Sequence, residues 1–287
     1  MAVVSDWLFT SAIGIYMLAA FLYAAEYVLA RRPVAAGRVA LARRPMERLE
    51  RLGLSLTVLG AGVHTASVVL RGLSVGRLPW GNMYEYLSAV GLAAVLTWLY
   101  VVRRYRPERV AVFVVLPVAL LLFVAGNFLY TEAAELQPAL RSYWIAIHVA
   151  AAVLASGVFL VSGVTSALHL VSEYRPERRI KLPQPEFLDR LAYRSGVFGF
   201  VTLTFAIITG AIWAEAAWGR FWGWDPKETV AFVSWVCYAA YLHARSTSGW
   251  RARRASWVNI MGLVIVLFNL FFVNLVAVGL HSYAGVQ

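Results

Sequence analysis

Residues 110–130 read VAVFVVLPVALLLFVAGNFLY, a run of 21 residues without a charged side chain. An α-helix needs about 20 mostly apolar residues to cross the hydrocarbon core of a bilayer, so this run predicts a transmembrane helix. The whole chain agrees, because 61% of its 287 residues are hydrophobic, 14% are charged, and the mean hydropathy is +0.67. A soluble domain of this length is far less apolar, which indicates an integral membrane protein.

The sequence predicts eight such spans, separated by short polar connections. They lie near residues 7–30, 52–70, 83–102, 110–130, 143–171, 196–214, 229–244 and 257–280. The seventh is marginal in length, and the fifth is long enough to project beyond the bilayer. We therefore expect an all-α, polytopic membrane helix bundle that forms a single domain over residues 1–287. The sequence shows no convincing internal repeat.

Basic residues gather in alternate connections. Of the 26 lysines and arginines, 21 lie in the connections that follow the first, third, fifth and seventh predicted spans. Cytoplasmic connections are rich in Lys and Arg, so these four are predicted to be cytoplasmic and both termini extracytoplasmic. This topology accounts for the net charge of +11 without a nucleic-acid partner. We expect a multi-pass protein of the plasma (inner) membrane.

The connection between the sixth and seventh spans contains the stretch WGRFWGWDPKE, residues 218–228. Its three tryptophans, Trp218, Trp222 and Trp224, lie on the predicted outer face. Interfacial tryptophans commonly anchor a protein in the bilayer, but an anchoring belt needs neither the glycine spacing nor the Asp-Pro that ends this stretch. The cluster therefore predicts a binding site for a flat ligand. The tryptophans that we interpret as ordinary interface anchors are Trp98, Trp144 and Trp213.

The end of the stretch has two compatible interpretations. Asp225 at an N-cap, Pro226 at the first helical position and Glu228 two residues later are typical of the start of a helix. Asp225 is equally a candidate contact for the ligand. Arg220 and Lys227 are either ordinary outer-face charges or cationic partners for carboxylates of the ligand.

Histidines supply the chemistry. An imidazole inside a bilayer is costly, so each intramembrane histidine is a functional hypothesis. His148, near the outer end of the fifth span, and His281, at the outer end of the eighth, share the predicted depth of the tryptophan stretch although 133 residues separate them. Haem iron accepts two axial imidazoles, and a porphyrin face stacks well on indole rings. The combination predicts a haem held at the outer surface.

The remaining histidines and the lone cysteine carry less information. His243 and His169 lie near the inner ends of the seventh and fifth spans, and His64 lies in the outer half of the second. Cys237 is alone and mid-span, so the chain offers no disulfide and no Cys-x-x-Cys pair. Any thiol chemistry must use the thiols of a partner.

Residues 218–228 resemble the tryptophan-rich "WWD" signature, WGxxWxWDxxE, of the haem-handling proteins of cytochrome c maturation. Three further segments resemble the CcsA/ResC branch of these proteins: LQPALRSYWIAIH at 136–148, GLHSY at 279–283 and PWGNMYE at 79–85. The resemblance covers residues 64 to 285.

The resemblance implies a subunit of the system II cytochrome c synthetase. Such a subunit transports haem b, its substrate and bound ligand, to the outer face and attaches it covalently to the Cys-x-x-Cys-His motif of an apocytochrome. Residues 215–228 would be the haem-binding segment, with His148 and His281 as axial ligands by motif match. His243 matches a third family histidine, tied to an earlier haem position within the membrane, and we expect its axial partner to come from another subunit.

The implied partners are a CcsB/ResB-type membrane protein with a large external domain, an apocytochrome c and a component of a thiol-reducing pathway. Two other functions stay open. The chain could deliver haem to a chaperone without ligation, or it could be a di-haem electron-transfer subunit. The second alternative predicts histidine pairs at two depths and has no use for an exposed tryptophan platform. His64 and His169 receive no role.

Overall fold

The computed structural model describes residues 1–30, 39–107, 109–134, 142–174, 182–247, 250, 252–277 and 280–281, and this part of the chain is helical and contains no strand. The prediction of an all-α bundle is confirmed for these residues. The elements are α1 (Ala2–Leu29), α2 (Val39–Val75), α3 (Met83–Tyr105), α4 (Ala111–Phe128), α5 (Tyr143–Tyr174), α6 (Pro185–Trp218), α7 (Pro226–Ser246), α8 (Ala252–Phe268) and a π-helix, η3 (Asn269–Val273).

Seven of the eight α-helices are long and apolar enough to cross a membrane, so the chain is a multi-pass membrane protein. The exception is α7, which corresponds to the marginal seventh span and does not meet the standard although it has 21 residues. Its crossing of the bilayer stays a prediction. The longest helices, α2, α5 and α6, run past the predicted spans because their polar ends continue the helix beyond the apolar centre.

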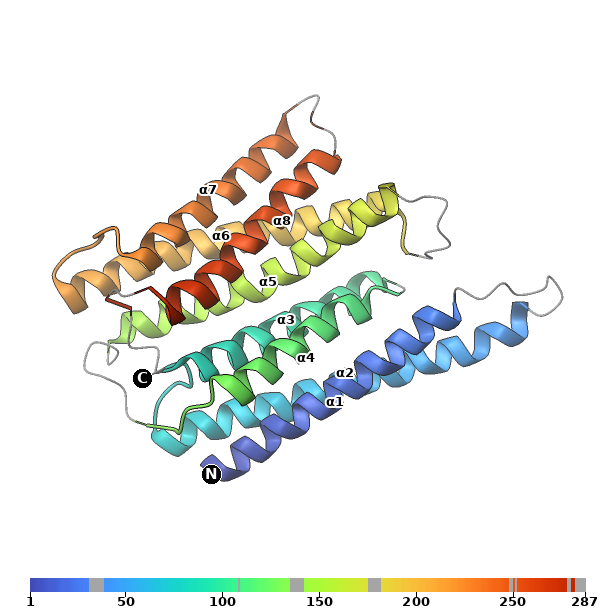
Figure 1. Cartoon of the computed structure of the whole chain (residues 1–287), viewed down its shortest axis with the longest axis horizontal. Helices are drawn as coiled ribbons and strands as arrows, with labels where there is room; N and C mark the ends of the chain where they lie inside the picture. Colours follow the sequence, from blue (N-terminus) through green and yellow to red (C-terminus); the bar gives the residue numbers. More distant parts are fainter. Residues whose placement is uncertain are drawn as a thin grey trace.

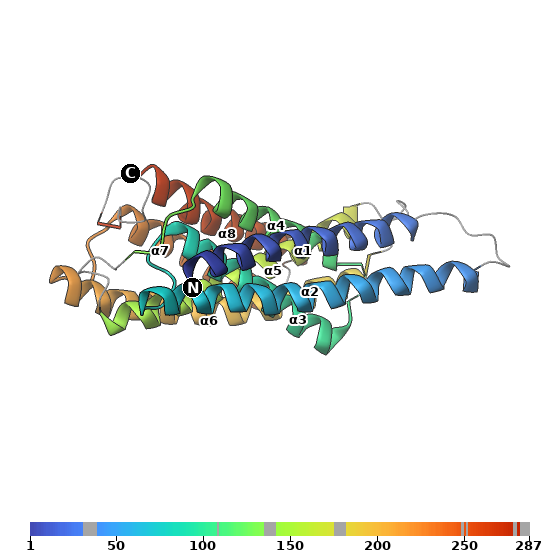
Figure 2. The same ribbon diagram turned by 90° about the horizontal axis from the view of Figure 1, so that it is seen from below.

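The helices lie side by side along the long axis of the molecule (Figures 1 and 2). Met1 and the turns 76–82 and 219–225 lie at one end, which we call the tryptophan end. The α3–α4 connection lies at the opposite end, beside the start of α6 (Figure 1). Each helix therefore runs opposite to its predecessor, as a chain that crosses a bilayer repeatedly must do.

Two four-helix units make up the bundle: α1–α4 and α5–α8 (Figure 1). In the first unit, α1 packs on α2 and α4, and α3 also packs on α2 and α4. In the second, α5 and α7 each pack on α6 and α8, which is the same pattern. The main contact between the units is α3 against α5. The sequence shows no convincing repeat, yet the two units share one packing pattern, because different apolar sequences can satisfy the same helix arrangement.

Two tryptophans that the sequence suggested as membrane anchors are core residues instead. Trp98 of α3 is 0% exposed, and Trp213 of α6 is 1% exposed. Trp144 is half-buried and packs against Trp213. An anchor must lie on the lipid-facing side of its helix, and helices as uniformly apolar as these do not reveal from sequence which side that is.

Gly157 of α5 sets the separation of the two units. A Cβ atom at this position would lie 2.6 Å from the backbone nitrogen of Ala94 on α3. Backbone atoms within a helix cannot move aside, so only glycine allows α3 and α5 to approach this closely.

We expect Gly157→Ala to lower the stability of the folded protein. Overpacking costs roughly 1–3 kcal/mol, which exceeds the gain of about 1 kcal/mol in helix propensity. Gly14→Ala is the matched control, because no atom lies within 4 Å of a Cβ built at this exposed α1 position. The measurement is thermal unfolding in detergent. Equal midpoints for the two variants would contradict the close approach.

Candidate haem-binding site

A mostly apolar cavity opens at the tryptophan end, between the two units. It holds about 210 Å³ of space that water could enter. Its walls come from the α2–α3 turn, α5, α6, the α6–α7 turn, α7 and the end of α8. Four residues that the sequence predicted as site residues line it: His148, His281, Trp218 and Trp222. The structure therefore brings together residues from both ends of the predicted signature.

Contacts with α6 fix the orientation of the His148 ring. Its Nδ1–H donates to the carbonyl oxygen of Ala206 at 2.7 Å. Gly210, one turn further along α6, leaves the room that the ring needs, since a Cβ there would lie 2.6 Å from Nδ1. A neutral imidazole that donates through Nδ1 carries its lone pair on Nε2, the atom available to a metal.

His281 is oriented in the same way by Asp225. Its Nδ1–H donates to Oδ1 of Asp225 at 2.9 Å, and the backbone N–H of Leu280 donates to Oδ2 at 2.8 Å. The carboxylate thus fixes the tautomer that places the lone pair on Nε2. A carboxylate behind a ligating histidine also raises the basicity of the ring.

Asp225 begins α7 as well, which confirms the predicted helix start. Its Oδ1 accepts the N–H of Lys227 at 3.0 Å, while Oε2 of Glu228 accepts the N–H of Asp225 at 3.1 Å. Asp225 and Glu228 form a capping box, and Pro226 occupies the first helical position. Burial by itself raises the pKa of Asp225, but the hydrogen bond and charge of His281 and the backbone donors lower the pKa from 3.8 to about 2.

Trp213 is the site residue that sequence reasoning missed. Its ring lies parallel to that of His148, with centroids 6.2 Å apart and planes 8° apart. Its centroid is also 5.8 Å from that of His281 and 4.6 Å from that of Trp218. The sequence offered one signal, the position of Trp213 in the last turns of α6, directly before the tryptophan stretch. That signal did not distinguish the cavity side of the helix from the lipid side.

Two of the three predicted tryptophans lie at the cavity, and the third does not. Trp218 packs edge-on against His281, with ring centroids 5.0 Å apart, and Trp222 lines the opening. Trp224 is 65% exposed and packs against Trp222 and Phe232. Its φ of 58° lies in the left-handed region, which is unusual for a bulky side chain.

The two cations of the stretch have different environments. The guanidinium of Arg220 lies over the ring of Trp218 and donates to Oε1 of Glu228 at 3.3 Å. Lys227 lines the cavity, and its Nζ donates to Oδ1 of Asn274 at 2.6 Å. Lys227 is therefore the cation that faces the cavity, whereas Arg220 is engaged within its own turn.

The other three histidines lie away from this cavity. His243 is exposed in the last turn of α7, near the opposite end of the bundle. His169 is buried, with Nδ1 hydrogen-bonded to Ser256 at 2.9 Å and Nε2 3.8 Å from Oε1 of Glu173. His64 is buried in the first unit, where Nε2 is hydrogen-bonded to Ser88 at 3.0 Å.

The donor set fits a haem. Haem iron takes axial imidazoles through Nε2, and both His148 and His281 use Nδ1 for a bond inside the chain. Indole rings beside both imidazoles supply apolar contact for a porphyrin edge or face. Lys227 supplies a cation for a carboxylate.

Residues 80–281 match the family described as cytochrome C assembly protein. The match begins at the α2–α3 turn and ends at His281, so it covers every wall of the cavity. The chain belongs to this family. It is a multi-pass membrane protein of cytochrome c biogenesis.

Curated relatives of the chain support the same family. The cytochrome c biogenesis protein CcsA of Parasynechococcus marenigrum (strain WH8102) is 36% identical over 250 residues, covering 76% of this chain and 82% of the relative. CcsA of Synechococcus sp. (strain RCC307) is 33% identical over 274 residues, covering 85% and 88%. CcsA of Prochlorococcus marinus (strain NATL1A) is 37% identical over 254 residues, covering 76% and 80%.

Among solved structures, the cytochrome c haem lyase CcmF superposes with a TM-score of 0.65 at 15% sequence identity. The match covers 94% of this chain and 46% of that one, so the chain spans less than half the length of CcmF. At this identity the likeness concerns the fold alone.

The pairing of Asp225 with His281 predicts a pH dependence. Because the pKa of Asp225 is lowered to about 2, the carboxylate stabilises the folded protein above about pH 4, and this contribution is lost as the pH falls through about 2. Asp225→Asn keeps a side-chain cap for α7 and removes the charge. We expect the variant to be less stable by on the order of 2 kcal/mol above pH 4, with the difference vanishing near pH 2.

The measurement is the unfolding midpoint in detergent from pH 6 to pH 2 for both proteins. Glu132→Gln, which removes an exposed carboxylate at the same end, is the control. A difference between wild type and Asp225→Asn that does not change with pH would contradict the role of the charge.

Proposed function

We propose that the cavity at the tryptophan end holds haem b, with iron between His148 and His281, and presents it for covalent attachment to an apocytochrome c. The observation that carries the proposal is the convergence of these two imidazoles, each oriented through Nδ1, on one cavity beside Trp213 and Trp218. In this function the chain is a subunit of a system II cytochrome c synthetase, and haem is its substrate.

The chain's own part is positioning. His148 and His281 would fix the iron, the indole rings of Trp213, Trp218 and Trp222 would restrict the tilt of the ring, and Lys227 would bind a propionate. The bound haem supplies two vinyl groups, to which the two cysteine thiols of an apocytochrome add. Each sulfur forms a bond to one vinyl carbon and the thiol proton goes to the other, so the addition needs no oxidant. A thiol-reducing pathway would keep the cysteines reduced.

The matured cytochrome would leave the chain by an exchange of axial ligands. The histidine of the apocytochrome Cys-x-x-Cys-His motif would replace one axial ligand of the chain. His281 suits this exchange, because it lies in a turn beyond α8 and is held by Asp225 and its neighbours, whereas His148 is fixed within α5 against α6. The distribution of basic residues supports an outer location of the cavity, with both termini on the extracytoplasmic side of the plasma membrane.

We further propose that His243 ligates haem at an earlier position within the membrane. Its exposure on α7 leaves the ring accessible to another subunit, in agreement with an axial partner from a CcsB/ResB-type protein. The same exposure argues against a di-haem electron-transfer subunit, which needs a second histidine pair on this chain. His169 has a polar partner near each of its ring nitrogens.

Replacement of either axial ligand should abolish maturation. We expect His148→Ala and His281→Ala to lower the yield of covalent haem on a reporter cytochrome c at least roughly tenfold, because each removes a bond to iron, and added imidazole should restore part of it. The chain is expressed with its companion and the reporter in a host without its own maturation system, and the yield is divided by the amount of chain in the membrane.

His169→Ala is the control, since it removes a buried histidine from the same helix as His148 at a distance from the cavity. Normal maturation in both ligand variants would sink the proposal. A haem-loaded chaperone without thioether-linked cytochrome would instead favour the delivery function.

His243→Ala should act on haem loading rather than on attachment. We expect the purified complex of chain and companion to contain less haem in this variant, while haem that reaches the outer cavity keeps the bis-histidine absorption spectrum. Haem content per complex and the visible spectrum are the measurements. Undiminished haem content would rule out the inner position.

A further inference from the structure

The turn before α3 is built on the same plan as the turn before α7. Both begin with an arginine, Arg77 or Arg220, that lies eight residues before a glutamate, Glu85 or Glu228. Each glutamate is the third residue of its helix and lies three residues after the N-cap. The two turns also occupy equivalent places, between the second and third helices of their four-helix units.

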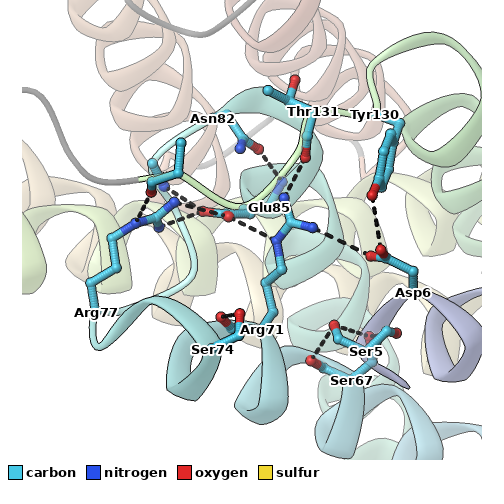
Figure 3. A network of polar contacts seen from close by, with 12 residues as sticks. Ser5, Asp6, Ser67, Arg71, Ser74, Arg77, Asn82, Glu85, Tyr130 and Thr131 are labelled. Carbon is cyan, nitrogen blue, oxygen red and sulfur yellow. Dashed lines mark hydrogen bonds and ion pairs between the residues drawn. The ribbon is translucent and has the colours of Figure 1, made fainter. Parts of the chain in front are cut away.

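The first turn closes around Glu85. Its Oε2 accepts the N–H of Gly81 at 2.8 Å and Nη1–H of Arg77 at 2.7 Å, and the side chain of Asn82 accepts the N–H of Glu85 at 2.9 Å. Figure 3 shows Glu85 between Arg77 and Arg71, and Arg71 donates from Nε to Oε1 at 3.0 Å. Glu85 is 2% exposed, and its two arginine partners neutralise its charge inside the protein.

The second turn closes around Glu228 with matching bonds. Its Oε2 accepts the N–H of Gly223 at 2.8 Å, and its Oε1 accepts Nη1–H of Arg220 at 3.3 Å. A glycine N–H and an arginine of the same turn are therefore partners of the glutamate in both units. The correspondence extends from helix packing to individual hydrogen bonds.

The first turn is also tied to the rest of its unit. Arg71 donates to Oδ1 of Asp6 on α1 at 3.3 Å and to the carbonyl oxygen of Thr131, and Tyr130 donates to Oδ2 of Asp6 at 2.8 Å (Figure 3). Arg71 is 2% exposed. This network joins α1, α2, α3 and the segment after α4, so the turn cannot move independently of the unit that carries it.

Both turns line the same cavity. Trp80, Gly81 and Asn82 contribute from the first turn and Trp222 from the second, and the helices that follow add Met83, Lys227 and Glu228. Substrate sites of membrane proteins with internal repeats commonly lie where the repeats meet. The tryptophan stretch is thus one of two equivalent walls, and the second wall carries a tryptophan of its own.

We propose that residues 77–85 form the second wall of the haem site, with Trp80 contacting the porphyrin and with Glu85 and Arg77 as positioning residues. The inference rests on the proposed function for the identity of the ligand. This second wall supplies no histidine, and it has Asn82 where the tryptophan stretch has Asp225, so its task is to enclose the ring and not to orient an axial ligand. A flat ligand between two walls loses freedom to tilt and is shielded from water.

The first test concerns Trp80. In the purified complex of chain and companion, we expect Trp80→Ala to release haem to an acceptor such as apomyoglobin roughly two- to tenfold faster, because one ring contact is lost. Trp80→Phe should restore most of the retention. Trp7→Ala is the matched control, since Trp7 is a 71% exposed tryptophan of α1 at the same end. Equal release rates for Trp80→Ala and Trp7→Ala would overturn the contact.

The second test concerns the ion pair between Glu85 and Arg77. Glu85→Gln keeps the shape of the side chain and removes its charge, and Arg77→Gln removes the partner within the turn. We expect both to speed the replacement of an axial ligand by added cyanide roughly tenfold and to shift the haem reduction potential, with the bis-histidine spectrum of the resting protein unchanged. Glu132→Gln is the control. A merely structural role would lower the amount of folded complex without changing either property.

The two proposals fail in different ways. If His148→Ala and His281→Ala mature cytochrome normally, the proposed function fails whatever Trp80 does. If these variants are inactive but Trp80→Ala, Glu85→Gln and Arg77→Gln retain haem and exchange ligands like wild type, the second wall alone is refuted.

Discussion

The carboxylate of Asp225 both starts a helix of the fold and orients a histidine of the candidate site. One of its oxygens caps α7 and accepts the Nδ1–H of His281, and the other accepts the N–H of Leu280. The start of a helix and the orientation of a histidine 56 residues further along therefore depend on a single side chain. Its low pKa keeps it charged at every physiological pH, so both tasks are done by the same ionised group.

Two buried glutamates, Glu85 and Glu228, also use a carboxylate to fix the start of a helix, one in each half of the molecule. Glu85 and Glu228 each satisfy backbone donors before a helix begins, which the first turn of a helix cannot do for itself. Their arginines neutralise them, so buried charge is tolerated where two four-helix units meet. Both turns line the cavity, and hydrogen bonds from a backbone N–H to each glutamate hold the two turns in place.

Much of this arrangement could be predicted from residues alone. Apolar runs located the helices, and the Asp-Pro before Glu228 predicted the start of α7. Basic residues in alternate connections predicted one depth for His148 and His281, and both line one cavity. Trp213 and Trp224 show where such reasoning ends. The ring of Trp213 lies near both histidines, whereas Trp224 is exposed and does not line the cavity, because the rotation of a helix and the course of a turn decide what a ring faces.

The sequence by itself determined the membrane class, the order of the helices and the kinds of residue at the site, because hydropathy, charge and cap chemistry act over a few neighbouring residues. Only the tertiary structure decided that the two units pack alike and that His243 stays on the surface. It also decided that Trp80 and Trp222, from two different turns, line one cavity. These facts depend on which faces of apolar helices meet. When a helix is apolar on every side, its sequence does not show which face packs against a neighbouring helix.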